Sequence, residues 1–179
     1  MHEKIYSCAR EIHSGSAAGR CVENDIPAVE IPPLRTPGML RDAVDSPGER
    51  SPDQLSGAYD GLLAETVRAV GPDAVATDSA VDRDHLDALL AGESPPLTLQ
   101  DAAAILAADG DRPDAEALAA EARDILLLGM SMAVLDVEAL ASGIDDQMQP
   151  KEIQQKVEGR QPMPLDEYAV LHSYIESQR

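Results

Sequence analysis

The chain contains no tryptophan and no phenylalanine, and its only aromatic residues are four tyrosines. Its apolar residues make up 44% of the sequence and are mostly alanine, leucine and valine. Small aliphatic side chains pack well between helices, whereas β-rich folds usually recruit aromatic residues. The composition therefore predicts an all-α fold.

Basic residues are also scarce. The sequence has 14 lysines and arginines against 33 acidic residues, which gives a net charge of −19. Such a charge with few aromatic residues is typical of disordered chains, but apolar residues at helical spacing across most of the sequence favour a folded protein. The composition resembles that of proteins from extreme halophiles. In molar salt the Debye length falls to about 3 Å, so a surface covered by carboxylates repels itself very little. We therefore expect a folded, halophilic protein.

Long hydrophobic runs are absent as well. No apolar run approaches the roughly 20 residues that a membrane-spanning helix needs. The densest run, residues 125–135, has the length of a buried helix. The N-terminus lacks the uninterrupted apolar segment of a secretory signal. We expect a cytoplasmic protein with no membrane contact.

Residues 1–38 form a leader that differs from the rest of the chain. The leader has four basic and five acidic residues, a net charge of −1, and leaves −18 for the remainder. It contains four prolines and shows no helical period longer than two turns. Two interpretations remain open: a disordered tail, or upstream sequence translated from a mis-assigned start, with Met39 as the natural first residue. We favour the second.

Cysteine does not occur after the leader. The leader's two cysteines and two histidines would be suitable zinc ligands, but their spacing matches no zinc motif that we recognise. A disulfide between the two cysteines would not persist in a reducing cytoplasm. We therefore expect no metal site and no disulfide; the four residues are His2, Cys8, His13 and Cys21.

Beyond the leader, the first half of the chain, residues 39–110, predicts four helices. Ser51, Pro52 and Gln54 form a capping-box pattern at the start of a long helix. Gly71 is expected to end that helix, because glycine adopts the left-handed conformation of a C-terminal cap. The four helices are expected to start at Ser51, near Asp73, at Asp82 and at Thr98.

The second half, residues 111–179, predicts a similar set of helices. We expect them to start near Pro113, Val137, Pro150 and Pro164. The long first helix carries apolar residues at three- and four-residue steps, which predicts one core-facing stripe. The residues of this stripe are Leu118, Ala122, Ile125, Leu128 and Met132.

The two halves also align with each other, which favours a duplicated module. At an offset of 67, the matched positions are Val81, Leu86, Gly92 and Pro95 with Met148, Ile153, Gly159 and Pro162. At an offset of 66, they are Leu97, Leu99, Ala103 and Ile105 with Met163, Leu165, Ala169 and Leu171. The alternative is that any chain of helix, glycine, proline and helix looks similar to itself. We expect two four-helix repeats that pack together.

Residues 78–106, "DSAVDRDHLDALLAGESPPLTLQDAAAIL", resemble the second-to-fourth-helix passage of Cro/C1-type, lambda-repressor-like DNA-binding domains. The residues at corresponding places are Ala76, Val81, Leu86, Gly92, Pro95 and Leu99. The resemblance implies a helix-turn-helix whose third helix projects its polar face toward a major groove. The whole chain also resembles an uncharacterised family of acidic haloarchaeal proteins, which has no assigned activity.

The two predicted repeats differ in the charge of their third helix. The outward residues of 82–91 include one arginine and three aspartates, which would repel DNA phosphates. Residues 149–160 carry three basic and two acidic residues on the face that we expect to be exposed. Glutamine reads adenine, and lysine and arginine bind guanine or phosphate. The candidate DNA-binding residues are Lys151, Gln154, Gln155, Lys156 and Arg160.

The alternative for this helix is a solvated basic face with no DNA contact, and ion pairs that bury Lys156 and Arg160 would favour it. No glycine-rich phosphate loop and no nucleophile pattern occurs, and His85 and His172 are isolated histidines that we expect at the surface. We therefore expect no enzyme activity and no cofactor. The expected partner is double-stranded DNA, bound by a transcriptional regulator. The alternative is another protein, bound by an adaptor, and a homodimer is compatible with both.

Overall fold

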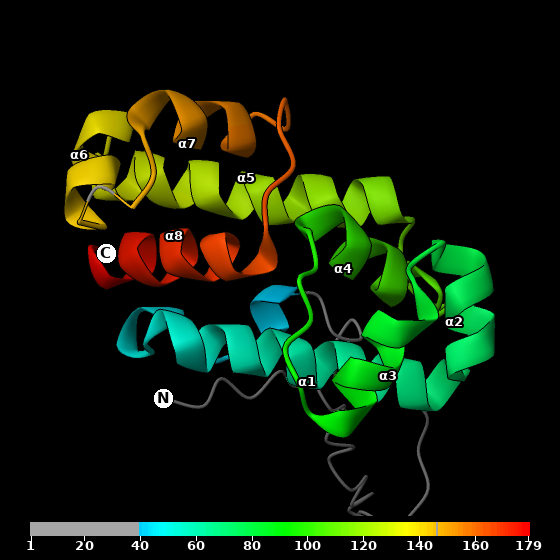
Figure 1. Ribbon diagram of the computed structural model, residues 1–179. Helices are drawn as coiled ribbons and strands as arrows, with labels where there is room; N and C mark the ends of the chain where they lie inside the picture. Colours follow the sequence, from blue (N-terminus) through cyan, green and yellow to red (C-terminus); the bar gives the residue numbers. More distant parts are fainter. Residues whose placement is uncertain (1–39, 146) are drawn as a thin grey trace, which may run out of the picture. The chain divides into compact units, whose positions relative to one another are not determined.

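The computed structural model describes residues 40–145 and 147–179, and Figure 1 shows their arrangement. The predicted leader and its cysteines and histidines lie outside the described residues. Within the described ranges the chain is all-helical and has no strand, which confirms the predicted fold class. The elements are two short 3₁₀ helices, η1 (Leu40–Ala43) and η2 (Pro47–Glu49), and eight α-helices: α1 (Pro52–Val70), α2 (Pro72–Ser79), α3 (Arg83–Ala91), α4 (Leu99–Ala107), α5 (Ala115–Ala133), α6 (Val137–Gly143), α7 (Pro150–Val157) and α8 (Leu165–Ser177).

Local sequence signals set most helix starts. Ser51 caps α1 in a complete capping box with Gln54, as predicted, and Thr98 caps α4 in the same way with Asp101. Gly71 ends α1 with a φ of 99°, a conformation that glycine adopts without steric cost. Asp82 stands at the start of α3, but its side chain makes no capping hydrogen bond. Side-chain oxygens thus define the starts of α1 and α4, where they satisfy otherwise unpaired N–H groups.

The helix lengths follow the same order in both halves. Among the α-helices, residues 40–110 contain one long helix, α1, followed by the shorter helices α2, α3 and α4. Residues 111–179 repeat this order with α5 followed by α6, α7 and α8. The long helices α1 and α5 both have 19 residues, and five of the six buried positions on each coincide at an offset of 63. The pairs are Leu55 and Leu118, Tyr59 and Ala122, Leu63 and Leu126, Thr66 and Gly129, and Val67 and Met130. The duplication of the module stays a prediction.

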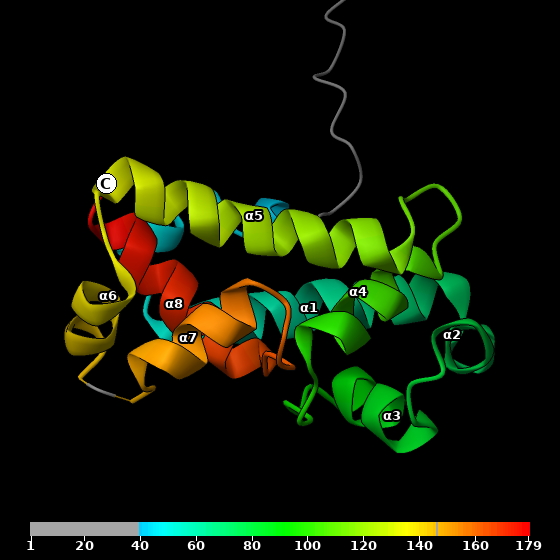
Figure 2. The ribbon, with the colours of Figure 1, turned by 90° about the horizontal axis from the view of Figure 1, so that it is seen from above.

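The two halves are joined through their long helices. α1 packs on α3 and α4 of its own half and on α8 of the second half, and α5 packs on α4 of the first half and on α8 of its own. α8 therefore lies between α1 and α5 (Figure 1). The short pairs α2–α3 and α6–α7 lie near opposite ends of α5 (Figure 2). The described residues belong to one compact unit, in which both halves contribute to a single hydrophobic core. Each half therefore completes the packing of the other.

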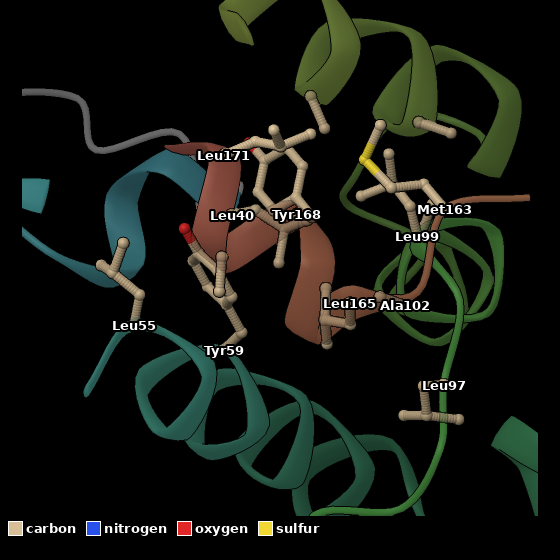
Figure 3. Close-up of a cluster of buried hydrophobic side chains, with 14 of the residues drawn as sticks. Leu40, Leu55, Tyr59, Leu97, Leu99, Ala102, Met163, Leu165, Tyr168 and Leu171 are labelled. Atoms are coloured by element: carbon tan, nitrogen blue, oxygen red, sulfur yellow. The ribbon is translucent and has the colours of Figure 1, made fainter. Parts of the chain in front are cut away.

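A short backbone pairing marks the centre of this arrangement. The N–H of Leu99 donates to the carbonyl of Met163 over 2.8 Å, and the N–H of Leu165 donates to the carbonyl of Leu97 over 2.9 Å. The bridge joins Thr98 and Pro164, which match at the predicted offset of 66. Each of these two hydrogen bonds becomes the other when the two halves of the chain are interchanged. Such a pairing is what a local two-fold axis produces. Figure 3 shows the four leucine and methionine side chains beside the tyrosines of the core.

The core-facing side of α5 differs from the prediction. Leu128 is 62% exposed and Met132 is 56% exposed, so their predicted place in the core is wrong. Leu126 and Met130 are buried instead. Residues 125–128 are four consecutive large aliphatic residues, so apolar spacing alone does not determine which of them faces inward. The packing of α5 on α4 and α8 selects the buried face.

Candidate interaction surfaces

The predicted DNA-binding residues lie on α7 and just after it. Ile153 and Val157 are buried and hold this helix on the core, as the sequence predicted. Lys151 and Gln154 are exposed, and Gln155 is half-buried. These three side chains leave a polar outer face on α7.

Lys156 does not belong to that face. Its side chain is only 7% exposed, and its Nζ donates to Glu152 over 2.6 Å and to Glu167 of α8. Burial by itself lowers the pKa of Lys156, but the hydrogen bonds and charges of the two carboxylates outweigh burial and raise it. The prediction that Lys156 is exposed is wrong, because the amine connects α7 to α8.

Arg160 is exposed but paired. Its Nη2 lies 2.9 Å from Glu158 Oε2, and Gln154 Nε2 donates to Glu158 Oε1 over 3.1 Å. Because the Arg160 side chain is 68% exposed, its ion pair with Glu158 contributes little to stability. A phosphate would therefore displace Glu158 from Arg160 at small cost. One carboxylate nevertheless engages two of the five predicted DNA-binding residues.

Arg123 of α5 is a cation that the sequence analysis did not assign to this surface. A Cβ placed on Gly159 would lie 3.2 Å from Arg123 Cζ, so the guanidinium lies against the turn between α7 and α8. Arg123 is 36 residues before Gly159 in the chain, and only the packing of α5 near α7 brings them together. In the sequence Arg123 can be recognised only as a polar residue within the predicted long helix. That position does not predict which residue its guanidinium contacts.

The connections within the two helix pairs also differ. Residues 80–82 join α2 to α3, with Ala80 in the left-handed conformation at φ 58°, whereas residues 144–149 join α6 to α7. A helix-turn-helix has a turn of three to four residues. The tight turn therefore occurs beside acidic α3, where Arg83 pairs with Asp73 and Asp87. The more basic α7 follows the longer connection.

A second surface is apolar and lies at the C-terminal end of α5. We call it the α5 surface; its residues are the four exposed large hydrophobic residues Leu127, Leu128, Met132 and Val134. Val134 is 90% exposed and ends the helix with a φ of 54°. Scattered apolar residues are common on protein surfaces, but four large ones within residues 127–134, at one end of one helix, favour an interaction site.

A pocket of about 230 Å³ borders the α5 surface. α5 supplies Ile125 and Leu128, η2 supplies Pro47, and α8 supplies His172 and Glu176. Arg179, which follows the end of α8, completes the lining. Arg179 Nη1 donates to Glu176 over 2.5 Å, and its Nη2 lies 3.2 Å from the sulfur of Met132. The α5 surface thus combines projecting apolar side chains with an adjacent hollow.

His172 in this pocket is buried, which corrects the prediction of a surface histidine. Its Nδ1 lies 2.7 Å from the hydroxyl of Tyr59, and its ring centroid lies 5.5 Å from that of Tyr168. Burial lowers the pKa of His172, while the charge of Glu176 opposes this and that of Arg179 adds to it. The neutral imidazole is therefore favoured.

Two absences concern residues 40–145 and 147–179 only. In these ranges, no group of three or more histidine, cysteine, aspartate or glutamate side chains is arranged to hold a metal ion. No single helix in the same ranges is long and apolar enough to cross a membrane; α5 and α6 pass that test only when counted together, across a bend of 94°.

Comparison with known proteins gives one family. The model described as "Family of unknown function (DUF5791)" matches residues 55–178, which run from α1 to the end of α8. No curated protein and no solved structure matches the chain.

Proposed function

The chain belongs to the DUF5791 family of unknown function, and because this membership brings no activity with it, we propose a function from the residues themselves. The protein is a non-enzymatic protein-protein interaction module, and it binds its partner through the α5 surface. Of the two functions expected from the sequence, this is the adaptor.

The single observation that carries the proposal is the exposure of the α5 surface. In a chain with a net charge of −19, large apolar side chains at exposed positions are costly in water unless a partner covers them. The matched helix α1 provides an internal comparison. At the offset of 63 that aligns their buried faces, Leu128 corresponds to Glu65, which is exposed. A leucine is therefore not needed at this position for the helix to pack.

DNA binding through α7 is the second candidate. Lys151, Arg160 and Arg123 support it, because they place three cations near the outer face of α7. The ion pairs of Lys156 weaken it, since this amine is neutralised by Glu152 and Glu167 before any phosphate approaches. Most of the affinity of a DNA-binding protein comes from neutralised phosphates, and α7 retains few cations for that purpose.

Site-specific photo-crosslinking tests the protein-binding function. We would place p-benzoylphenylalanine at position 128 and, as the matched control, at position 65 of α1, in cells that naturally make the protein. We expect a discrete adduct from position 128 and none from position 65, because only the first position lies on the α5 surface. Equal labelling from both positions, or none from either, would overturn the proposal.

Fluorescence anisotropy with genomic DNA fragments, across a range of KCl concentrations, tests the second candidate. Binding through α7 would be weakened for all sequences by Lys151→Glu and Arg160→Glu, because these changes remove phosphate contacts. Gln154→Ala or Gln155→Ala would instead relax the preference at single base pairs, by about 1–3 kcal/mol. Arg83→Glu on acidic α3 is the matched control. If no DNA binds at any salt concentration, DNA binding is rejected and protein binding is the remaining candidate function.

A further inference from the structure

We propose that the partner of the α5 surface is a second copy of this chain, packed antiparallel across a two-fold axis near Leu128. The inference rests on the proposed function, because it requires that the α5 surface binds protein. It adds the identity of the partner and the residues that align the two copies.

The shape of the surface is self-complementary. Leu128 and Met132 project from α5, and the 230 Å³ pocket between α5, η2 and α8 lies directly beside them. A two-fold axis near Leu128 places Leu128 of one copy against Leu128 of the other and brings the rims of the two pockets side by side. The same patch then serves both copies, which is the defining property of an isologous dimer.

The charges at the two ends of the surface are opposite. Asp124 is exposed and lies one helical turn before Leu128. Arg179 lies against Met132, which is one turn after Leu128. The carboxylate thus borders one end of the α5 surface, and the guanidinium borders the other.

These charges select the antiparallel arrangement. When two helices cross antiparallel about Leu128, residues at equal distances on either side face one another, so Asp124 of each copy faces the corner that Met132 and Arg179 form on the other. Two equivalent carboxylate–guanidinium pairs result, and in each of them Arg179 is shared between Asp124 of the other copy and Glu176 of its own chain. A parallel arrangement would instead place Asp124 against Asp124 and Arg179 against Arg179, and like charges in contact across an interface are strongly unfavourable.

The matched surface on α1 does not have these features. At the same offset of 63, Asp124 corresponds to Gly61, Leu128 to Glu65 and Met132 to Ala69. Apolar side chains and a bordering carboxylate therefore occur together on one of the two long helices. The difference is expected if one face of the molecule is reserved for a second copy.

The test is charge exchange between two separately purified variants, Asp124→Arg and Arg179→Glu, followed by light scattering after gel filtration. Measurements are made at the lowest KCl concentration that gives full helicity by circular dichroism, because higher salt screens the pairs. We expect the wild type to be a dimer. Each variant alone places like charges in both pairs, so its dissociation constant should rise at least about tenfold.

An equimolar mixture of the two variants is the decisive sample. In the heterodimer, one pair joins the two substituted side chains, which have exchanged their charges, and the other pair joins the native Arg179 to the native Asp124. Both pairs are therefore attractive, and dimers should reappear with nearly wild-type affinity. A variant that had merely misfolded would not be rescued in this way. Glu65→Arg on α1 is the control, and it should dimerise as the wild type does.

Three results would overturn the inference: a monomeric wild type at every protein concentration, single variants that dimerise normally, or a mixture that stays monomeric. The photo-crosslink from position 128 separates this failure from failure of the proposed function. An adduct of twice the chain mass supports the second copy. An adduct of any other mass rejects the second copy but leaves protein binding standing, and the absence of an adduct rejects both.

Discussion

Lys156 illustrates how a single contact changes the role of a residue. Its position in the sequence, among glutamines and other cations, favours an exposed basic face. In the structure its amine lies between Glu152, one helical turn earlier on α7, and Glu167 on α8. The first of these contacts is readable from the four-residue spacing, but the second requires α8 to pack beside α7.

The charge of Lys156 should therefore matter for stability. Lys156→Glu places three carboxylates together at a mostly buried position, and we expect it to lower the free energy of unfolding by more than about 2 kcal/mol. Lys151→Glu, at an exposed position on the same helix, should change it by less than about 0.5 kcal/mol. Urea denaturation of both variants measures the difference. Equal, small effects would mean that the ion pairs do not hold α7 on α8.

His172 should make stability depend on pH. Its pKa lies below the ordinary 6.5 in the folded chain, because burial disfavours the imidazolium. As the pH falls below about 6.5, the unfolded chain takes up a proton that the folded chain does not, so stability is lost until the pH reaches the folded pKa. Above 6.5 the contribution is fully present.

Urea denaturation between pH 7.5 and 5 measures this loss, with His172→Gln as the comparison. We expect the wild type to lose more stability on acidification than the variant, by about 1.4 kcal/mol for each unit by which the pKa is lowered. Carboxylates that titrate in the same range contribute equally to both proteins, so the difference isolates the imidazole. Identical slopes would show that His172 titrates at its ordinary pKa in the folded chain.

At the scale of elements, the start of a helix and its buried face are decided differently. The caps of α1 and α4 involve residues within three positions of each other, so Ser51 and Thr98 could be identified from the sequence. The inner face of α5 depends on which neighbours cover it, and the run of residues 125–128 offered several equally apolar faces. The misassigned Leu128 thereby became the central residue of the proposed interface.

Gly48 tests how η2 is held on α8. A Cβ added at this position would lie 2.6 Å from the carbonyl carbon and oxygen of Glu176, which are backbone atoms and cannot rotate away. The contact is reinforced by Ser173, whose hydroxyl donates to the carbonyl of Arg50 over 2.6 Å. We expect Gly48→Ala to destabilise the protein by about 1–3 kcal/mol, through displacement of η2 from α8.

The control for Gly48→Ala is Gly57→Ala. Gly57 lies on the exposed side of α1, where an added Cβ would meet nothing within 4 Å. Because alanine has the higher helix propensity, this change should stabilise the protein by about 0.5–1 kcal/mol. Thermal unfolding followed by circular dichroism compares the two. The same sign for both would mean that helix propensity, rather than the close approach to α8, controls the effect.

At the scale of the whole molecule, the net charge of −19 should make folding depend on salt. We expect the protein to lose helicity in dilute buffer and to regain it in molar KCl, because screening removes the repulsion among carboxylates. Circular dichroism follows the transition. Sucrose is the control, since it favours the compact state without screening charge. Equal helicity in dilute and concentrated salt would remove the halophile hypothesis.

The all-helical fold of the described residues, the start of most helices and the repeated order of the helices could all be read from the sequence. These properties follow from composition and from contacts between residues a few positions apart, which a linear pattern records. The packing of α1 on α8 and of α5 on α4, the burial of Lys156 and His172 and the exposure of Leu128 could not be read from it. Each of these depends on which helix covers which face, and that choice is made by packing between residues far apart in the chain.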